Sequence, residues 1–105
     1  ISVKSASHQL FIQKITLSIT THVAGDVFSF DDDGTGGIIA SHIDVAAGAT
    51  ALDVITWDFG PEGLALTVGA NLDAYHTTTA VARAHIEAYE KLSATISYLA
   101  GAELQ

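Results

Sequence analysis

Apolar and polar residues alternate along several short stretches of the chain, with the period of two that is typical of β-strands. In the stretch 14–20 the isoleucine and leucine side chains point to one side and the polar side chains point to the other. Its β-branched residues favour a pleated surface. A turn that contains Gly25 follows, and 27–30 predicts a second strand, so we expect these two strands to pair as a hairpin.

Further strands are predicted between turns that are rich in glycine, aspartate and proline. In 54–59 the apolar residues Ile55, Trp57 and Phe59 share one face, and the Gly60-Pro61-Glu62-Gly63 segment then breaks the pattern. The segment 31–37 is a predicted loop, and 45–51 is a loop or at most one helical turn. The predicted strands after the hairpin cover 38–43, 54–59, 64–67, 71–75 and 81–92.

The last of these stretches, 81–92, fits a strand and also fits a helix. Alanine and isoleucine residues alternate with charged residues over seven positions, but Tyr89 falls on the polar side. Ala, Glu, Lys and Leu are good helix formers, which favours a helix. We predict a strand, because the alternation persists and every preceding element is also a predicted strand.

Seven short strands with glycine-containing turns every 8–12 residues predict an all-β fold. The expected architecture is a single antiparallel β-sandwich or jelly-roll-like domain, and a chain of 105 residues fits one such domain. Within this domain, which covers 1–105, the segment 1–9 is an expected N-terminal arm. The segment 93–105 is an expected C-terminal tail, which we expect to pack on a neighbouring subunit.

Composition narrows the range of partners. The formal net charge is −8 and the chain has only four Lys and Arg residues, which are too few and too scattered to bind a phosphate backbone. The same charge disfavours anionic membrane surfaces, and no stretch approaches the ~20 apolar residues of a membrane-spanning helix. The chain has no cysteine, so thiol chemistry and disulfides are excluded. An apolar fraction of 49% in so short a chain favours burial of some surface in an assembly.

The run Asp31-Asp32-Asp33-Gly34 is a candidate calcium loop, because hard cations prefer carboxylate oxygens. It does not fit an EF-hand: with Gly34 at the sixth position, Ala40 takes the place of the bidentate glutamate. A looser calcium site and a solvated loop both remain open. The histidines show no metal-ligand spacing, and we expect each to lie at the surface or at an interface. They are His8, His22, His42, His76 and His85.

No catalytic motif is present. The chain lacks the G-x-S-x-G and phosphate-binding glycine patterns, and Asp58 and Glu62 are a weak candidate pair of carboxylates for glycoside chemistry. Trp57 is either a core residue or a sugar-stacking platform, and we favour the core. We therefore predict a non-enzymatic protein and assign no residue to catalysis, to a cofactor or to a metal.

The order of these features resembles a group of known proteins. The segments that carry the resemblance include Trp57-Asp58-Phe59-Gly60 and Asn71-Leu72-Asp73, within the region 11–92. They are similar to small β-sandwich virion proteins of tailed bacteriophages, which include capsid decoration (cement) proteins and head-fibre or tail accessory proteins. The resemblance implies a structural protein on the capsid surface, a homotrimer that clamps major capsid subunits or other virion proteins without doing chemistry.

Two other functions stay open at this point. A carbohydrate-binding module would use Tyr75, Tyr89 or Tyr98 as stacking platforms. A helical-hairpin secretion partner would place Trp57-Asp58-Phe59-Gly60 at the bend between two helices.

Overall fold

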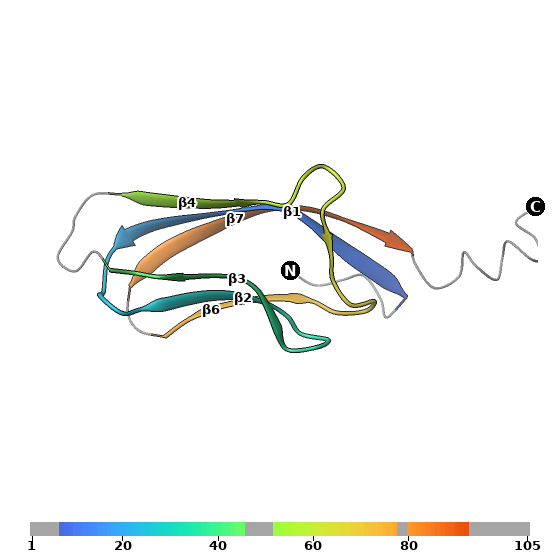
Figure 1. Ribbon diagram of the computed structural model, residues 1–105, viewed down its shortest axis with the longest axis horizontal. Helices are drawn as coiled ribbons and strands as arrows, with labels where there is room; N and C mark the ends of the chain where they lie inside the picture. Colours follow the sequence, from blue (N-terminus) through green and yellow to red (C-terminus); the bar gives the residue numbers. More distant parts are fainter. Residues whose placement is uncertain (1–6, 46–51, 78–79, 93–105) are drawn as a thin grey trace, which may run out of the picture.

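The computed structural model describes residues 7–45, 52–77 and 80–92, and every regular element within them is a β-strand. The strands are β1 (His8–Thr21), β2 (Val27–Asp32), β3 (Gly37–Ile43), β4 (Asp53–Asp58), β5 (Leu64–Ala65), β6 (Leu72–His76) and β7 (Val81–Leu92). They form two antiparallel sheets that pack face to face (Figure 1). The predicted all-β sandwich is confirmed, and the helical hairpin is wrong. The described residues include no helix with the length and hydropathy of a membrane span.

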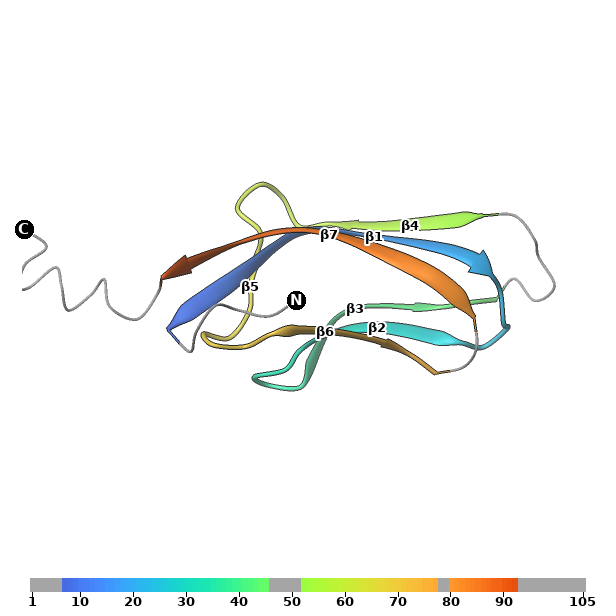
Figure 2. The ribbon, with the colours of Figure 1, turned by 180° about the vertical axis from the view of Figure 1, so that it is seen from behind.

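Sheet A is the larger of the two sheets, and β1 is its central strand. β7 pairs with β1 over almost the whole length of both strands, from His8 opposite Leu92 to Thr21 opposite Val81. On its other side β1 pairs first with β5 and then with β4. The smaller sheet, sheet B, has the strand order β3-β2-β6. Figure 2, which views the molecule from behind, shows sheet B below sheet A.

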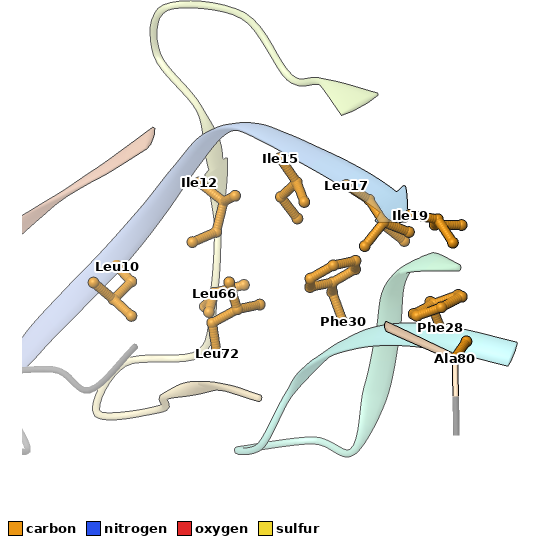
Figure 3. Packing of buried hydrophobic residues seen from close by; sticks show 11 residues of the cluster. Leu10, Ile12, Ile15, Leu17, Ile19, Phe28, Phe30, Leu66, Leu72 and Ala80 are labelled. Carbon is orange, nitrogen blue, oxygen red and sulfur yellow. The ribbon is translucent and has the colours of Figure 1, made fainter. Parts of the chain in front are cut away.

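The core lies between the two sheets and is built on β1. Leu10 and Ile12 point inward, and after a bulge between Ile12 and Lys14 the inward positions become Ile15, Leu17 and Ile19. The bulge adds one residue to β1, so the alternation restarts in the opposite phase and keeps the apolar residues on one face. Phe28, Phe30 and Leu72 meet them from sheet B, and Leu66, the residue after β5, packs beside them (Figure 3). Each such side chain contributes roughly 1.5–3 kcal/mol when fully buried.

The predicted hairpin between the first two strands is wrong. β1 and β2 lie in different sheets, and β2 pairs with β3 and β6 instead. Both sides of β1 are already occupied by sheet A strands, so the chain crosses to the second layer through the turn at Gly25, which has a φ of 85°. Two consecutive strands with one apolar face each can either pair in one sheet or pack across a core, and periodicity alone does not distinguish these arrangements.

The strand predicted over 81–92 is confirmed as β7, and Ala82, Ile86 and Ala88 pack against the core. The N-terminal arm predicted over 1–9 is too long, because β1 begins at His8. Residues 1–6 and the predicted tail 93–105 lie outside the described residues, as does most of the predicted loop 45–51. The strand predicted over 64–67 is reduced to the two residues of β5.

The turn between β4 and β5 depends on a glycine. Gly63 has a φ of 81°, and a Cβ atom there would lie 3.2 Å from the Phe11 side chain and the Ile12 carbonyl oxygen. A larger residue would therefore be strained in conformation and would also crowd β1. This close approach brings β5 alongside β1.

Candidate functional site

One end of the sandwich contains a buried histidine–aspartate pair. Nδ1 of His22, the residue after β1, lies 2.9 and 3.0 Å from the two carboxylate oxygens of Asp44, the residue after β3. Their side chains are only 0% and 1% exposed. The backbone N–H of Val23 donates to Asp44 Oδ2 at 3.1 Å. The pair therefore joins the end of a sheet A strand to the end of a sheet B strand.

A second buried carboxylate, that of Asp26, holds the end of β6 at the same end of the molecule. Its Oδ1 accepts hydrogen bonds from the backbone N–H and the hydroxyl of Thr77, both at 2.8 Å. Nδ1 of His76 lies 3.4 Å from Asp26 Oδ2, and the His76 side chain is 40% exposed. These contacts fix the connection that leads from β6 toward β7.

Burial decides what these clusters can do chemically. A general base must come within hydrogen-bond reach of a substrate proton, and neither His22 nor Asp44 reaches solvent. The geometry of this pair suits a structural role, in which it holds the ends of β1 and β3 together. The prediction of a surface or interface histidine is wrong for His22, because the chain turns between the sheets immediately after β1 and encloses the ring. His85, by contrast, is exposed on the outer face of sheet A, with Nε2 3.9 Å from Glu87 Oε2.

The candidate calcium loop is shorter than predicted: Asp31 and Asp32 end β2, and a hydrogen-bonded turn follows them. Asp32 accepts bonds from the Gly34 N–H at 2.9 Å, from the Thr67 N–H at 2.8 Å and from the Thr67 hydroxyl at 2.9 Å. Burial alone raises the pKa of this carboxyl, but these hydrogen bonds to its charged form outweigh burial and lower its pKa below the ordinary value. Asp33 Oδ1 accepts the Asn71 N–H at 2.8 Å. In 7–45, 52–77 and 80–92, no three His, Asp or Glu residues are grouped to hold a metal ion.

An apolar cleft of about 130 Å³ opens between the two sheets on the β6–β7 side. Its floor is formed by Leu17, Phe28 and Phe30, and its walls include Ala82 and Ala84 of β7. The cleft exists because β7 places small alanine side chains on its inner face. On the other side of β1, the larger Ile55 and Trp57 of β4 pack against the core.

The outer faces of the two sheets differ in charge. Every Lys and Arg in the described part of the chain, namely Lys14, Arg83 and Lys91, lies on the outer face of sheet A. The outer face of sheet B carries the carboxylates Asp31 and Asp73, which are directly opposite each other. The same face exposes large apolar side chains, and these are Ile38, Ile43 and Tyr75.

The remaining candidate residues have separate roles. Trp57 packs against the core edge-to-face with Phe30, with ring centroids 5.7 Å apart. Its side chain faces the core, as predicted, but is only partly buried. Asp58 Oδ1 accepts the Gly60 N–H at 2.9 Å and so fixes its own turn, and Glu62 lies exposed beyond that turn. The Tyr89 ring stacks on Phe11.

The comparisons with known proteins return no relative: neither a protein-family model, nor a curated protein, nor a solved structure matches the chain.

Sequence reasoning missed the polar clusters because their members are far apart in the chain. His22 and Asp44 are 22 residues apart, and Asp26 and Thr77 are 51 residues apart. One signal was available. Asp26, Asp44 and Thr77 each lie beside a strand boundary, where a buried carboxylate can accept otherwise unpaired backbone N–H groups.

Proposed function

We propose that this chain is a non-enzymatic structural protein of a tailed-bacteriophage virion, a capsid decoration protein that bridges and stabilises major capsid subunits. The observation that carries the proposal is the outer face of sheet B, which exposes Ile38, Ile43 and Tyr75 to solvent. Exposed apolar residues that share one sheet face favour a protein-binding surface. Nucleic acid and membranes are not proposed as partners, given the net charge of −8.

The charges beside this face indicate what it binds. Asp31 and Asp73 lie on the same face as the apolar side chains, so a matching partner presents Lys or Arg residues around an apolar centre. Charge complementarity of this kind guides a subunit onto its site and fixes its orientation there. A regular capsid lattice offers many identical copies of such a surface, which suits a small protein with one binding face.

The virion context comes from the resemblance in strand order and in the segments Trp57-Asp58-Phe59-Gly60 and Asn71-Leu72-Asp73. A quantitative protein inventory of purified virions tests it directly. A copy number in the hundreds is expected for a capsid protein, and a handful of copies would place the chain in the tail, the neck or a head fibre instead. Absence from virions would overturn the proposal. The homotrimer that the resemblance implies stays a prediction.

A matched pair of variants tests the binding face. Ile43 on the outer face of sheet B and Val54 on the outer face of sheet A have similar exposed fractions, 57% and 55%. We expect Ile43→Lys to abolish binding to undecorated capsids in a sedimentation assay, while Val54→Lys binds like the unmodified protein. Equal binding by both variants would show that sheet B is not the capsid-binding face.

A carbohydrate-binding module is the second candidate, and the exposed ring of Tyr75 favours it. The ring of Tyr89 is engaged by Phe11 and its hydroxyl donates to the Glu62 carbonyl oxygen at 2.6 Å, so it is not free to stack on a sugar. Tyr98 lies outside the described residues. A glycan array on which the protein binds, and on which Tyr75→Ala does not, would favour this candidate over capsid decoration.

A further inference from the structure

β7 is a long edge strand. It pairs with β1 along twelve residues, and no other described strand pairs with its second edge. An unprotected edge strand presents backbone N–H and C=O groups that pair readily with another strand. Proteins commonly block such edges with short strands, bulges or inward-pointing charges. The register of β7 with β1 is shifted by bulges only on the β1 side, so β7 itself has no bulge. Its inner face carries one charged residue, Glu90, near the end of the strand and opposite Leu10.

The outer face of β7 is complementary to itself. Arg83, His85 and Glu87 follow one another at every second position on this face. If two copies of β7 pair antiparallel about His85, Arg83 of each copy lies opposite Glu87 of the other. Directly opposed residues on one sheet face interact, and opposite charges there are favourable. The two-fold symmetry produces this favourable pair twice.

The neighbouring registers do not place Arg83 opposite Glu87. Centring the pair on Ile86 moves Arg83 opposite Tyr89 and leaves His85 opposite Glu87. Centring it on Glu87 places the two Glu87 carboxylates opposite each other and Arg83 opposite Lys91, and like charges in direct opposition are destabilising. Centring it on Ala84 places Arg83 opposite His85 and Glu87 opposite Val81. Among these registers, only the one centred on His85 places Arg83 opposite Glu87.

The inner face of β7 fits the same register. Centring on His85 places Ala84 opposite Ile86 of the second copy, and Ala82 opposite Ala88. Ala82 and Ala84 line the open apolar cleft. The Ile86 side chain of the second copy would then lie at the side of the cleft where the alanines leave it open. Pairing thus covers apolar surface in addition to satisfying the strand edge.

We propose that two copies of this chain associate through β7, antiparallel and centred on His85, so that their two sheets A form one continuous sheet. This two-fold dimer is an alternative to the homotrimer that the resemblance implies, and the two exclude each other. Such an interface uses the same surface on both copies and closes as a dimer. It leaves the outer face of sheet B of both copies accessible, so a dimer would present two copies of the proposed capsid-binding face.

Cysteine cross-linking tests the register. The chain has no cysteine, so His85→Cys introduces a single thiol. Directly opposed residues in an antiparallel pair have Cα atoms about 4.5–5.5 Å apart, which is within the range for a disulfide. Thr16→Cys is the matched control, because Thr16 lies beside His85 on the same face but one strand further in. Across the proposed dimer its two copies are roughly 14 Å apart, too far for a disulfide.

Under mild oxidation we expect His85→Cys to form a covalent dimer and Thr16→Cys to stay non-covalent. Equal cross-linking of the two variants would overturn the proposed register.

A charge exchange tests the interaction itself. Arg83→Glu and Glu87→Arg each place like charges opposite one another twice, and we expect each to weaken the dimer by about tenfold or more. The double variant R83E/E87R restores both pairs and should recover the dimer. Lys91→Glu is the control, because it makes the same change in charge on the outer face of β7 but beyond the segment 81–89 that the two copies share.

Native mass by light scattering over a dilution series is the measurement, with circular dichroism to confirm that each variant folds. A trimer or a persistent monomer for the unmodified chain would overturn the proposal, as would a double variant that dimerises no better than the single ones. Both experiments use the purified protein alone, so their failure is distinct from a failure to bind capsids.

Discussion

The two ends of the sandwich are both closed by buried aspartates, but the partners of these aspartates differ. At the end where β1 turns into β2, Asp44 meets the ring of His22, and Asp26 meets Thr77 and His76. At the other end Asp32 accepts only backbone N–H groups and one hydroxyl. At the first end, the aspartates and the histidines that they contact are all ionisable. At the second end, one charged carboxylate accepts hydrogen bonds from neutral donors.

The difference follows from what each end has to join. Around Asp32, a single carboxylate holds the β2–β3 loop and the segment between β5 and β6 through their backbone N–H groups. At the end with His22, the two residues that directly follow β1 and β3 meet through their side chains, so the imidazole ring spans the gap between the two sheets. A buried charge supported by several hydrogen bonds is stable when ionised. A buried pair instead depends on both members being present.

Removing the histidine from the first end should have the largest effect on stability. We expect His22→Leu to lower the free energy of unfolding by about 3–5 kcal/mol, because Asp44 stays buried and loses its ring partner. Urea denaturation measures this loss of stability. His42→Leu is the control, since His42 lies on the inner face of sheet B and is only partly buried. A loss below about 1 kcal/mol would show that the pair contributes little beyond filling space.

Removing the charge from the second end should have a smaller effect. Asp32→Asn keeps the shape of the side chain but replaces one acceptor oxygen by a donor group, so at least one of its hydrogen bonds is lost. We expect a loss of about 2 kcal/mol in the free energy of unfolding. The neighbouring Asp33→Asn is the matched control, because Asp33 is exposed and its Oδ1 accepts the N–H of Asn71. Equal effects would remove the distinction between the buried and the exposed aspartate.

Acid should act on the second end through Asp32. Its pKa in the folded chain is lowered, because hydrogen bonds from Thr67 and Gly34 outweigh the opposing effect of burial. The stabilisation is therefore fully present above the unfolded pKa of about 3.9 and is lost as the pH falls through the lower folded pKa. Unfolding free energies measured between about pH 5 and pH 2 should decline less steeply for Asp32→Asn. An identical slope in both proteins would show that Asp32 does not contribute to acid unfolding.

The sequence predicts the two-sheet fold better than it predicts the polar contacts at the two ends of the sandwich. Periodicity identified β4, β7 and the second half of β1 with their inner faces, because alternation depends on neighbouring residues. It did not identify the first half of β1, because the bulge between Ile12 and Lys14 reverses the phase of the alternation. The pairing of strands was harder: β1 and β2 have the pattern of a hairpin but lie in different sheets. The His22–Asp44 pair could not be predicted, because it depends on how the crossing turn at Gly25 brings two distant segments together.

Two threonines provide the finest comparison of the ends, and the smallest expected effects. The hydroxyl of Thr67 donates to Asp32 at 2.9 Å, and that of Thr77 donates to Asp26 at 2.8 Å. The Thr77 hydroxyl also accepts the Val27 N–H at 3.1 Å, so it links β6 to the start of β2 through two hydrogen bonds. We expect Thr67→Val to lower the unfolding free energy by about 0.5–1 kcal/mol and Thr77→Val by about 1–2 kcal/mol.

Urea denaturation of the two valine variants in parallel measures this difference, because valine preserves the β-branched shape and removes only the hydroxyl. A larger loss for Thr67→Val would mean that the end with Asp32 depends more on its hydroxyl than the end with Asp26 does. In that case the backbone N–H donors at Asp32 would be the weaker contacts, although the Thr67 N–H lies only 2.8 Å from the carboxylate. The expected order follows from counting bonds: one is lost at Thr67 and two at Thr77.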